Sequence, residues 1–295
     1  MSTIHLPLPS YDDAVVVIPA PGEGTGNWAG AASAVLVDGV FWLTWRERRP
    51  LTDGRGVAVH VARSEDGVAF TEVARIRRED FGAESFERPV LVPVPGVGWR
   101  LYLSCATPGS KHWWVDSLTA ATPDGLAGGE RRVVLAGEEA TGVKDPVIRR
   151  VGDGWEMWLC CHPLDLPGHE DRMTTRRLTS DDGLEWTDRG EVLAGRPQQW
   201  DERGARVTTV VAADPLTVLY DGRPDAESNW YERTGVAVWD GDRLVADDRV
   251  APLSSPFGKG ALRYAAAVAL PDGRTRFYFE AARPDGAHDL VTSVS

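Results

Sequence analysis

The chain has 295 residues, of which 42 % are hydrophobic and 12 are tryptophan, so it carries enough apolar material for a large core. Its formal net charge of −12 argues against a nucleic-acid partner, because binding to phosphates needs a basic surface. No stretch is apolar enough to span a membrane and the first residues lack the pattern of a signal peptide, so we expect a cytoplasmic protein without a membrane partner.

A strand-turn-strand unit returns five times along the chain. Each copy consists of an apolar strand, a turn and a second strand that is rich in Trp, Tyr or Phe. The first residues of the copies, which lie between 56 and 61 positions apart, are Ser33, Pro89, Pro146, Val207 and Ala265. A fixed period of this length with β-type content is typical of a propeller blade of four strands. The repeat therefore predicts an all-β fold, a five-bladed β-propeller.

An outer pair of strands follows each inner pair. In the first unit the outer strands join at Ser64-Glu-Asp-Gly, and in the third unit they join at Ser180-Asp-Asp-Gly. An Asp-Gly pair between alternating strands predicts a hairpin, because glycine tolerates the positive φ that the turn needs. We expect the polar side chains of these turns to hold the outer hairpins together; they are Ser64, Asp66, Ser180 and Asp182.

The fifth unit lacks one strand, because only residues 288–294 follow its inner pair. The apolar segment 14–19 can supply the missing strand, and closure of the ring by the N- and C-terminal strands would remove an open sheet edge. The repeat spans nearly the whole length without a linker. We therefore expect residues 1–295 to form a single five-bladed β-propeller domain.

Ionisable side chains gather at the positions that open the inner strands or follow the second strands. In a propeller these positions crowd one mouth of a central funnel, where charges are costly unless they are paired or used. The pattern predicts a site there. Its candidate residues are Trp28, Glu47, Glu87, Arg88, Trp113, Lys144, Asp145, His162, Glu202, Arg206, Arg263 and Tyr264.

The repeat pattern, Glu87-Arg-Pro, Lys144-Asp-Pro and the Ser-x-Asp-Gly turns together resemble the five-bladed propeller glycosidases. The resemblance is to glycoside hydrolase family 43, with relatives in families 32, 62 and 130, and it implies an enzyme that cleaves glycosides. Family 43 places an Asp base in its first blade. This chain has Ala31, Ala32 and Ser33 at that position, so the usual base is missing.

Glycoside cleavage needs two carboxyl groups across the scissile bond, one protonated and one ionised. We expect Asp145, Glu87 and Glu202 to be catalytic, and Glu47 to contact the substrate. The rings of Trp28 and Trp113 suit the faces of a sugar.

Basic residues form a second group of predicted substrate contacts, from different blades: Arg88, Lys144, Arg206 and Arg263. A guanidinium fork fits a carboxylate or phosphate, so these side chains either bind an anionic group of the substrate or neutralise the acids around them. His162 and Tyr264 complete the set of substrate contacts. No His or Cys spacing indicates a metal site, and we expect no cofactor; a calcium ion on the axis stays open.

The leading interpretation is a glycoside hydrolase acting on a small or terminal sugar in the central funnel. One alternative is a glycoside phosphorylase, in which the basic cluster holds inorganic phosphate and one carboxylic acid suffices. Another is a non-catalytic sugar-binding propeller that has lost the first-blade Asp. In each case the partner is a small carbohydrate, and the arginines favour one that carries an anionic group.

Overall fold

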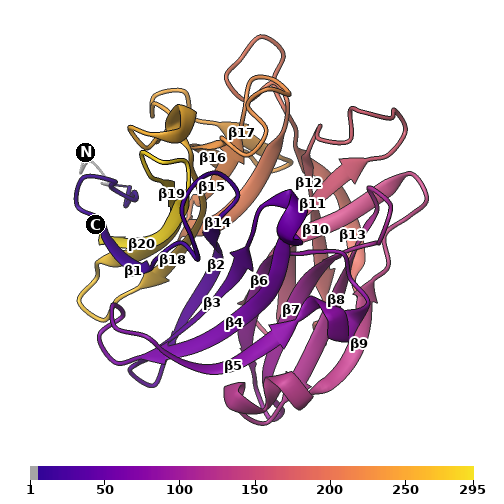
Figure 1. Ribbon diagram of the computed structural model, residues 1–295, viewed down its shortest axis with the longest axis vertical. Coiled ribbons are helices and arrows are strands. Elements are labelled where there is room, and N and C mark those ends of the chain that lie inside the picture. The colour runs from indigo at the N-terminus through magenta and orange to yellow at the C-terminus, as the bar shows by residue number, and fades with distance from the viewer. Residues whose placement is uncertain (1–5) are drawn as a thin grey trace.

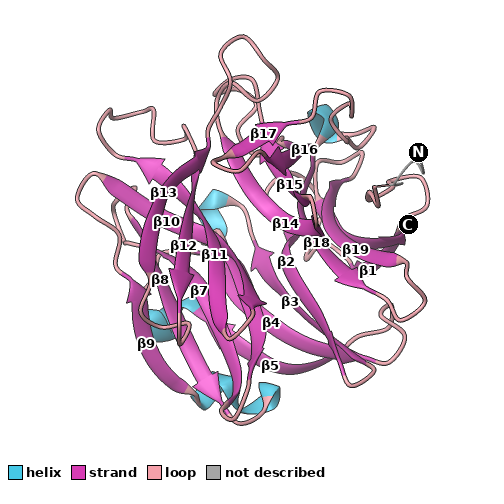
Figure 2. Cartoon of the chain, turned by 180° about the vertical axis from the view of Figure 1, so that it is seen from behind, coloured by secondary structure: helices cyan, strands magenta, loops and turns pink. Residues whose placement is uncertain are grey.

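The computed structural model describes residues 6–295 and consists mainly of β-strands, which confirms the predicted all-β class and is consistent with a β-propeller (Figure 1). Short 3₁₀ helices occupy Leu51–Asp53, Arg78–Phe81, Pro123–Gly128 and Gly258–Gly260 (Figure 2). No helix within residues 6–295 is long and apolar enough to cross a membrane.

Three sheets have four antiparallel strands each, in the order of the chain. The first contains β6 (Phe86–Val94), β7 (Gly98–Ala106), β8 (Trp113–Ala120) and β9 (Glu130–Leu135). The second contains β10 (Thr141–Val151), β11 (Gly154–Pro163), β12 (Thr174–Ser180) and β13 (Thr187–Leu193). The third contains β14 (Ala205–Ala213), β15 (Leu216–Gly222), β16 (Arg233–Trp239) and β17 (Leu244–Ala246).

The fourth sheet has eight strands and brings both ends of the chain together. One part consists of β2 (Trp28–Val37), β3 (Val40–Arg48), β4 (Gly56–Ser64) and β5 (Thr71–Arg77), and the other of β18 (Leu262–Ala269), β19 (Thr275–Ala282), β20 (His288–Val294) and β1 (Val15–Ile18). A single parallel pair, Trp28 with His288, joins the two parts. Val15 pairs with Thr292, so the predicted pairing of segment 14–19 beside 288–294 is confirmed.

The first strand of each group of four lies in the middle of the molecule (Figure 1). These strands, β2, β6, β10, β14 and β18, contact one another in that cyclic order, and β18 contacts β2 again. We call them the inner strands. Side-chain hydroxyls connect several of them: the Leu91 N–H donates to Ser33 Oγ, and the Ala267 N–H donates to Thr209 Oγ1, each over 3.1 Å. These hydrogen bonds fix the position of each inner strand along its neighbour.

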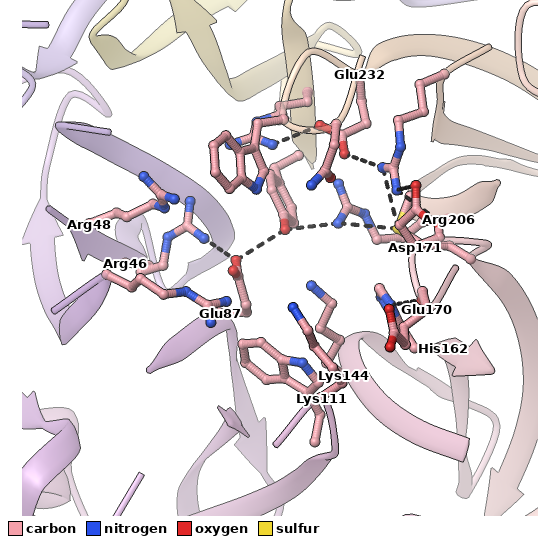
Figure 3. A pocket seen from close by; sticks show the side chains of 18 of the residues that line it. Arg46, Arg48, Glu87, Lys111, Lys144, His162, Glu170, Asp171, Arg206 and Glu232 are labelled. Carbon is pink, nitrogen blue, oxygen red and sulfur yellow. Dashed lines mark hydrogen bonds and ion pairs between the residues drawn. The ribbon is translucent and has the colours of Figure 1, made fainter. Parts of the chain in front are cut away.

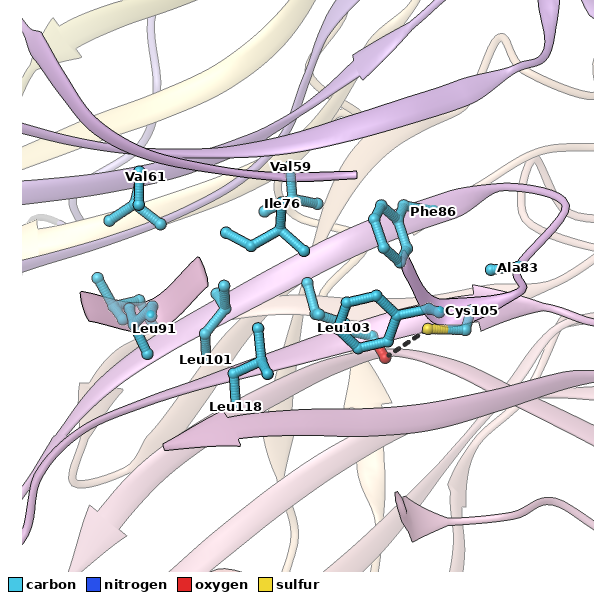
Figure 4. Packing of buried hydrophobic residues seen from close by; sticks show 13 residues of the cluster. Val59, Val61, Ile76, Ala83, Phe86, Leu91, Leu101, Leu103, Cys105 and Leu118 are labelled. Carbon is cyan, nitrogen blue, oxygen red and sulfur yellow. Dashed lines mark hydrogen bonds between the residues drawn. The ribbon is translucent and has the colours of Figure 1, made fainter. Parts of the chain in front are cut away.

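Apolar side chains fill the spaces between neighbouring sheets. In the cluster of Figure 4, Val59 and Ile76 of the fourth sheet pack with Leu91, Leu101 and Leu103 of the first. All five are nearly fully buried. Burial of each such side chain stabilises the fold by roughly 1.5–3 kcal/mol. The core therefore lies between sheets and leaves the ends of the inner strands for polar groups.

The two Ser-x-Asp-Gly turns are structural, as predicted. Asp66 Oδ1 accepts the Ser64 hydroxyl and two backbone N–H groups, and Asp182 is held in the same way by Ser180. Each turn also contacts the adjacent group of strands. The hydroxyl of Tyr278 donates to the carbonyl of Gly67 over 2.8 Å, and Tyr102 donates to Gly183 over 2.6 Å.

Candidate functional site

A cavity of about 740 Å³ opens where the inner strands begin (Figure 3). Its wall includes eight basic and five acidic side chains, an excess of positive charge in a chain whose net charge is −12. The basic side chains are Arg46, Arg48, Arg55, Lys111, Lys144, Arg206, Arg223 and Arg263, and the acidic ones are Glu84, Glu87, Glu170, Asp171 and Glu232.

Most of the residues that the sequence singled out lie at this cavity. Those that line it are Trp28, Glu87, Trp113, Lys144, His162, Arg206, Arg263 and Tyr264. Asp145 lies directly behind the wall: it is fully buried and bonded to residues that line the cavity. The position of the residues that open the inner strands therefore follows from the repeat.

Local backbone geometry aims these residues inward. Ala31, Asp145 and Tyr264 have φ values of 53°, 51° and 55°, and each lies where the register between the inner strand and its partner shifts. Such bulges re-aim side chains, and a left-handed conformation at a residue other than glycine is costly, so it persists only where the surroundings enforce it. Ala31 has the same conformation without a polar side chain.

A hydroxyl joins two carboxylates at the floor of the cavity. Tyr264 Oη lies 3.2 Å from Glu87 Oε2 and 3.2 Å from Asp145 Oδ2, so these two oxygens are no farther apart than twice that distance. Arg206 Nη1 donates to Asp145 Oδ2 over 2.9 Å and to Tyr264 Oη over 2.8 Å. Arg46 pairs with Glu87 (Figure 3). The hydroxyl accepts from Arg206 and has a single proton, so Tyr264 can donate to only one of the two carboxylates at a time.

A second ion-pair network forms the adjacent wall. Glu232 accepts from Arg223 Nη1 over 2.5 Å and from Arg263 Nη1 over 2.7 Å. Arg263 also pairs with Glu280 over 2.6 Å, and Glu280 accepts from His288 Nδ1 over 2.7 Å. All five side chains are almost fully buried, so removal of one charge would leave its partner uncompensated.

These ion pairs keep the carboxylates ionised. Burial alone would raise the pKa of Glu87, but Arg46 and Lys144 hold it below its ordinary value. Burial likewise opposes ionisation of Asp145 and Glu232, yet the pKa of each lies well below its usual range because cations surround it. Burial does raise the pKa of Asp221, which lies behind Arg206 and does not line the cavity. The carboxylates at the floor are therefore suited to act as bases, nucleophiles or charge partners.

Four cations at the cavity lack a hydrogen-bonded carboxylate among the described residues: Arg48, Arg55, Lys111 and Lys144. Arg48 and Lys144 are the most deeply buried of them. Arg48 lies over the ring of Trp28, 3.9 Å from its centroid, and its Nη1 donates to the carbonyls of Gly26 and Arg49. The Lys144 ammonium lies 3.6 Å from Asp145 Oδ2, beyond hydrogen-bond distance, and 4.7 Å from the ring centroid of Trp113. Both side chains can bind an anion without giving up an existing bidentate pair.

His162 presents an acceptor to the cavity. Its Nδ1 lies 2.7 Å from the carbonyl oxygen of Glu170, which only accepts, so Nδ1 carries the proton. Nε2 then carries the lone pair, and it is buried without a partner in the part of the chain that the structure describes. Burial, together with Lys144, lowers the pKa of His162 to about 3. The neutral ring can accept a hydrogen bond from a ligand hydroxyl.

Besides Asp145, three predicted site residues do not line the cavity. Arg88 and Glu47 each follow or precede a residue that does line it, and successive side chains on a strand face opposite ways. Glu47 pairs instead with Arg75 and His60, and Arg88 is described below. Glu202 is exposed in the turn before β14, where its carboxylate accepts the Gln198 N–H over 2.7 Å. These placements correct the prediction.

The predicted set of site residues omits several residues of the wall, among them Arg46, Arg48, Arg223, Trp230 and Glu232. Arg46 and Arg48 end β3 and Arg223 follows β15, so the prediction for positions after second strands could have found them. Glu232 precedes a third strand, β16, and Trp230 lies in the loop before it. Neither of these two positions carries a repeat signal.

Solved structures share the fold of this chain over almost its full length. One is a family GH43_1 enzyme from Xanthomonas citri complexed with xylotriose, with 11 % identity, 96 % of this chain and 91 % of that chain covered, and a TM-score of 0.70. Another is a thermostable family-43 glycoside hydrolase, with 13 % identity, 94 % and 91 % covered, and a TM-score of 0.69. A third is a β-1,2-mannobiose phosphorylase from Listeria innocua, with 13 % identity, 98 % and 92 % covered, and a TM-score of 0.67.

The similarity to these structures confirms the resemblance that the sequence indicated, at the level of the fold. No protein-family model and no curated protein sequence matches the chain. At such low identities a shared fold does not establish a shared reaction, and function has to be argued from the site.

Proposed function

We propose that this chain is an enzyme that cleaves a small or terminal glycoside carrying an anionic group, bound in the cavity at the start of the inner strands. The observation that carries the proposal is the arrangement of Glu87, Tyr264 and Asp145 at the floor, beneath a wall with more cations than anions. The similar structures are enzymes that act on glycosides, and this supports the same class of substrate.

The proposal includes a five-bladed propeller formed by residues 1–295 as one domain. It is supported by the five groups of four strands and by the cyclic contacts of the inner strands. The eight-stranded sheet would count as two blades, because only the pair of Trp28 with His288 joins its halves. The cavity would then lie on the propeller axis.

In the proposed reaction, Glu87 is the ionised carboxylate that approaches the anomeric carbon or activates water beside it. Tyr264 orients Glu87: burial raises its pKa, so the hydroxyl stays protonated and donates a hydrogen bond to Glu87 or Asp145, and the departing sugar oxygen would take its proton from water in the cavity. Asp145 does not reach the cavity; it fixes Tyr264 and balances the charge of Arg206. Trp113 lines the cavity beside the sugar, and His162 accepts from a sugar hydroxyl. Trp28 is 1 % exposed, with its ring stacked on His288 and covered by Arg48, so it positions Arg48 and offers no ring face to a sugar.

Arg48, Lys144 and Lys111 would receive the anionic group of the substrate. Arg48 and Lys144 lack a hydrogen-bonded carboxylate among residues 6–295, and Lys111 lines the same side of the cavity as Lys144 (Figure 3). A guanidinium offers a carboxylate or phosphate two parallel bonds, whereas an ammonium offers a point charge. A uronate or a sugar phosphate can bind to a guanidinium and to an ammonium in these two ways.

The same cations favour a second candidate, a phosphorylase in which inorganic phosphate is the nucleophile. The phosphate would lie between Lys144 and Arg48, and one of the structures with this fold is a phosphorylase. A third candidate, sugar binding without cleavage, is favoured by Ala31, which has the backbone conformation of Asp145 but no carboxylate.

A panel of neutral, uronate-bearing and phosphorylated disaccharides, incubated with and without inorganic phosphate, separates these candidates. We expect release of free sugar from an anionic substrate. Glu87→Gln should reduce turnover by about a hundredfold or more, given typical acid–base contributions of 10²–10⁴. Glu84→Gln is the matched control, since Glu84 lines the cavity but its carboxylate lies in solvent-accessible surroundings.

Release of a sugar 1-phosphate only when phosphate is added would assign the phosphorylase. Saturable binding of an anionic sugar without turnover would assign the binding module. Equal turnover in the Glu87 and Glu84 variants would remove Glu87 from the mechanism.

A further inference from the structure

A second space lies farther along the inner strands, beyond the floor of the cavity. We call it the axial chamber; its volume is about 580 Å³, and residues of all five inner strands line it. Along each inner strand, the residues that line the cavity precede the residues that line the axial chamber. Arg206 lines the cavity and Thr208 the chamber, and Tyr264 lines the cavity and Ala266 the chamber. The two spaces therefore share one axis.

The chamber has an apolar wall that the fold leaves partly open. Ala34, Val35, Val147, Val210 and Ala267 line it, and all five are only half-buried although they lie on the inner strands. Apolar surface that stays accessible at the centre of a protein is stabilised when another apolar group covers it. A volume of this size is within the range of sites for small organic ligands.

Arg88 forms the inner end of the chamber. Its side chain is 2 % exposed, and its Nη2 donates to the carbonyl of Ala265 on β18 over 3.3 Å. Nε and Nη1 have no partner among residues 6–295. The neighbouring carboxylate of Asp145 accepts the backbone N–H of Arg88, and it pairs with the guanidinium of Arg206.

The guanidinium of Arg88 thus lacks a direct carboxylate partner. Burial lowers its pKa to about 10, so it remains charged at neutral pH. A buried cation whose donors are unsatisfied is costly. A carboxylate could accept from Nε or Nη1, with the second N–H of Nη2 completing the fork.

We propose that the axial chamber binds a small carboxylate with an apolar chain, whose carboxylate pairs with Arg88 and whose chain lies along the half-buried valines and alanines. The buried guanidinium and the apolar wall together select one class of ligand. An inorganic anion would leave the apolar wall uncovered, and a cation would be repelled by Arg88. The site is separate from the cavity that holds the proposed reaction.

The first test uses the unmodified protein and three probes with the same eight-carbon chain: octanoate, octan-1-ol and octylamine. Calorimetric titration should show saturable binding of octanoate, and octanoate should raise the thermal midpoint. Octan-1-ol should bind at least about tenfold more weakly, because a bond to a charged group contributes roughly 1.5–3 kcal/mol. Octylamine should not bind. Absence of octanoate binding, or equal affinity for the alcohol, would overturn the proposal.

The second test separates the chamber from the cavity with two matched variants. Arg88→Met removes the buried guanidinium and should weaken octanoate binding at least about tenfold, with octan-1-ol unaffected. Arg48→Met makes the same change in the wall of the cavity and should leave octanoate binding unchanged. Loss of binding in the Arg48 variant alone would mean that octanoate occupies the cavity, which contradicts the proposal.

A third variant, Ala267→Phe, fills the chamber from β18 without touching Arg88. It should abolish octanoate binding while circular dichroism stays that of the unmodified protein. If Arg88→Met does not fold, Ala267→Phe and the comparison of the three probes still test the proposal. Octanoate binding that persists in Ala267→Phe would contradict a site in the chamber.

Discussion

Asp145 is held as a buried anion by several groups at once. Its carboxylate accepts from Arg206, from Tyr264 and from the backbone of Arg88, and the Lys144 ammonium lies 3.6 Å away. Its exposed fraction is 0 %. Such a residue does not contact a substrate; it sets the orientation and charge of the groups that do.

Asp145→Asn should reduce turnover by about a hundredfold or more while substrate binding is largely retained. The variant keeps the shape but leaves Arg206 with one carboxylate fewer, so the free energy of unfolding should fall by roughly 3 kcal/mol. Asparagine tolerates the left-handed backbone at this position, so strain adds little. Steady-state kinetics and urea unfolding would measure both effects.

Asp38→Asn is the matched control, because Asp38 has the same φ of 51° in an exposed turn. It should change neither turnover nor stability. Unchanged turnover in the Asp145 variant would exclude Asp145 from any part in the reaction.

His162 should make the protein less stable as the pH falls. In the folded protein its pKa is about 3, whereas its ordinary value is 6.5. Below about pH 6.5 the unfolded chain therefore takes up a proton that the folded protein refuses, and stability is lost progressively down to about pH 3. His162→Gln should flatten the decline of the thermal midpoint between pH 6.5 and 5. The buried His288, whose pKa is also lowered, will leave part of the slope.

The exposed His169 provides the control for this measurement. His169→Gln should leave the pH dependence as it is. If the thermal midpoint declines equally with falling pH in the His162 variant and in the unmodified protein, His162 becomes protonated in the folded state.

At the scale of strands and turns, much of the arrangement could be predicted because it depends on local pattern. The Asp-Gly hairpins, the pairing of β1 with β20 and the inward position of Glu87, Lys144 and Tyr264 all follow from the repeat. A pattern with period two does not fix which neighbour faces the cavity. Glu47 and Arg88 were placed at the cavity although their neighbours face it, because a shift of one residue at a bulge exchanges the two sides of a strand.

The part of the site that the sequence did not indicate comes from longer-range contacts. Glu232 lies in the wall because Arg223, which follows β15, and Arg263 of β18 both pair with it. The sequence next to Glu232 carries no pattern that indicates these pairs. The axial chamber depends on five strands that are far apart in the sequence. That Arg88 lacks a carboxylate partner can be recognised only when all five strands are placed.

Contacts between outer turns and neighbouring strands should contribute measurably to stability. Gly67 and Gly183 have φ values of 72° and 73°, and each presents its carbonyl to a tyrosine hydroxyl. Tyr278→Phe removes one buried hydrogen bond and should lower the free energy of unfolding by about 1 kcal/mol. Tyr102→Phe also removes the long bond that Arg100 Nη1 donates to the hydroxyl over 3.5 Å, so its loss should be at least as large.

Chemical unfolding would measure these two variants, with Tyr231→Phe as a comparison, since Tyr231 is only partly buried on the loop between β15 and β16. An additive loss in the double variant is expected because the two turns lie on different sheets. No loss in either variant would mean that water replaces the tyrosine hydroxyl as the donor to the turn carbonyl without cost.

For the molecule as a whole, β1 protects an edge. It pairs with β20, which otherwise has β19 along one side and a single pair with β2 along the other. Deletion of residues 1–19 would expose the edge of β20 and should lower the thermal midpoint and increase self-association, as open strand edges do. Light scattering during heating would detect this. Deletion of residues 1–5 alone is the control, and equal behaviour of the two deletions would contradict a protective role.

The pairing of β1 with β20 also has a consequence for biosynthesis. A ribosome adds roughly 5–20 residues per second, so β1 emerges roughly ten seconds to a minute before its partner exists. The sheets of β6–β9, β10–β13 and β14–β17 consist of consecutive strands and can form as they leave the exit tunnel. The eight-stranded sheet is completed last, and until then the nascent protein displays the unpaired β1 and an open side of β2. We expect chaperones that recognise exposed apolar strands to act during this interval.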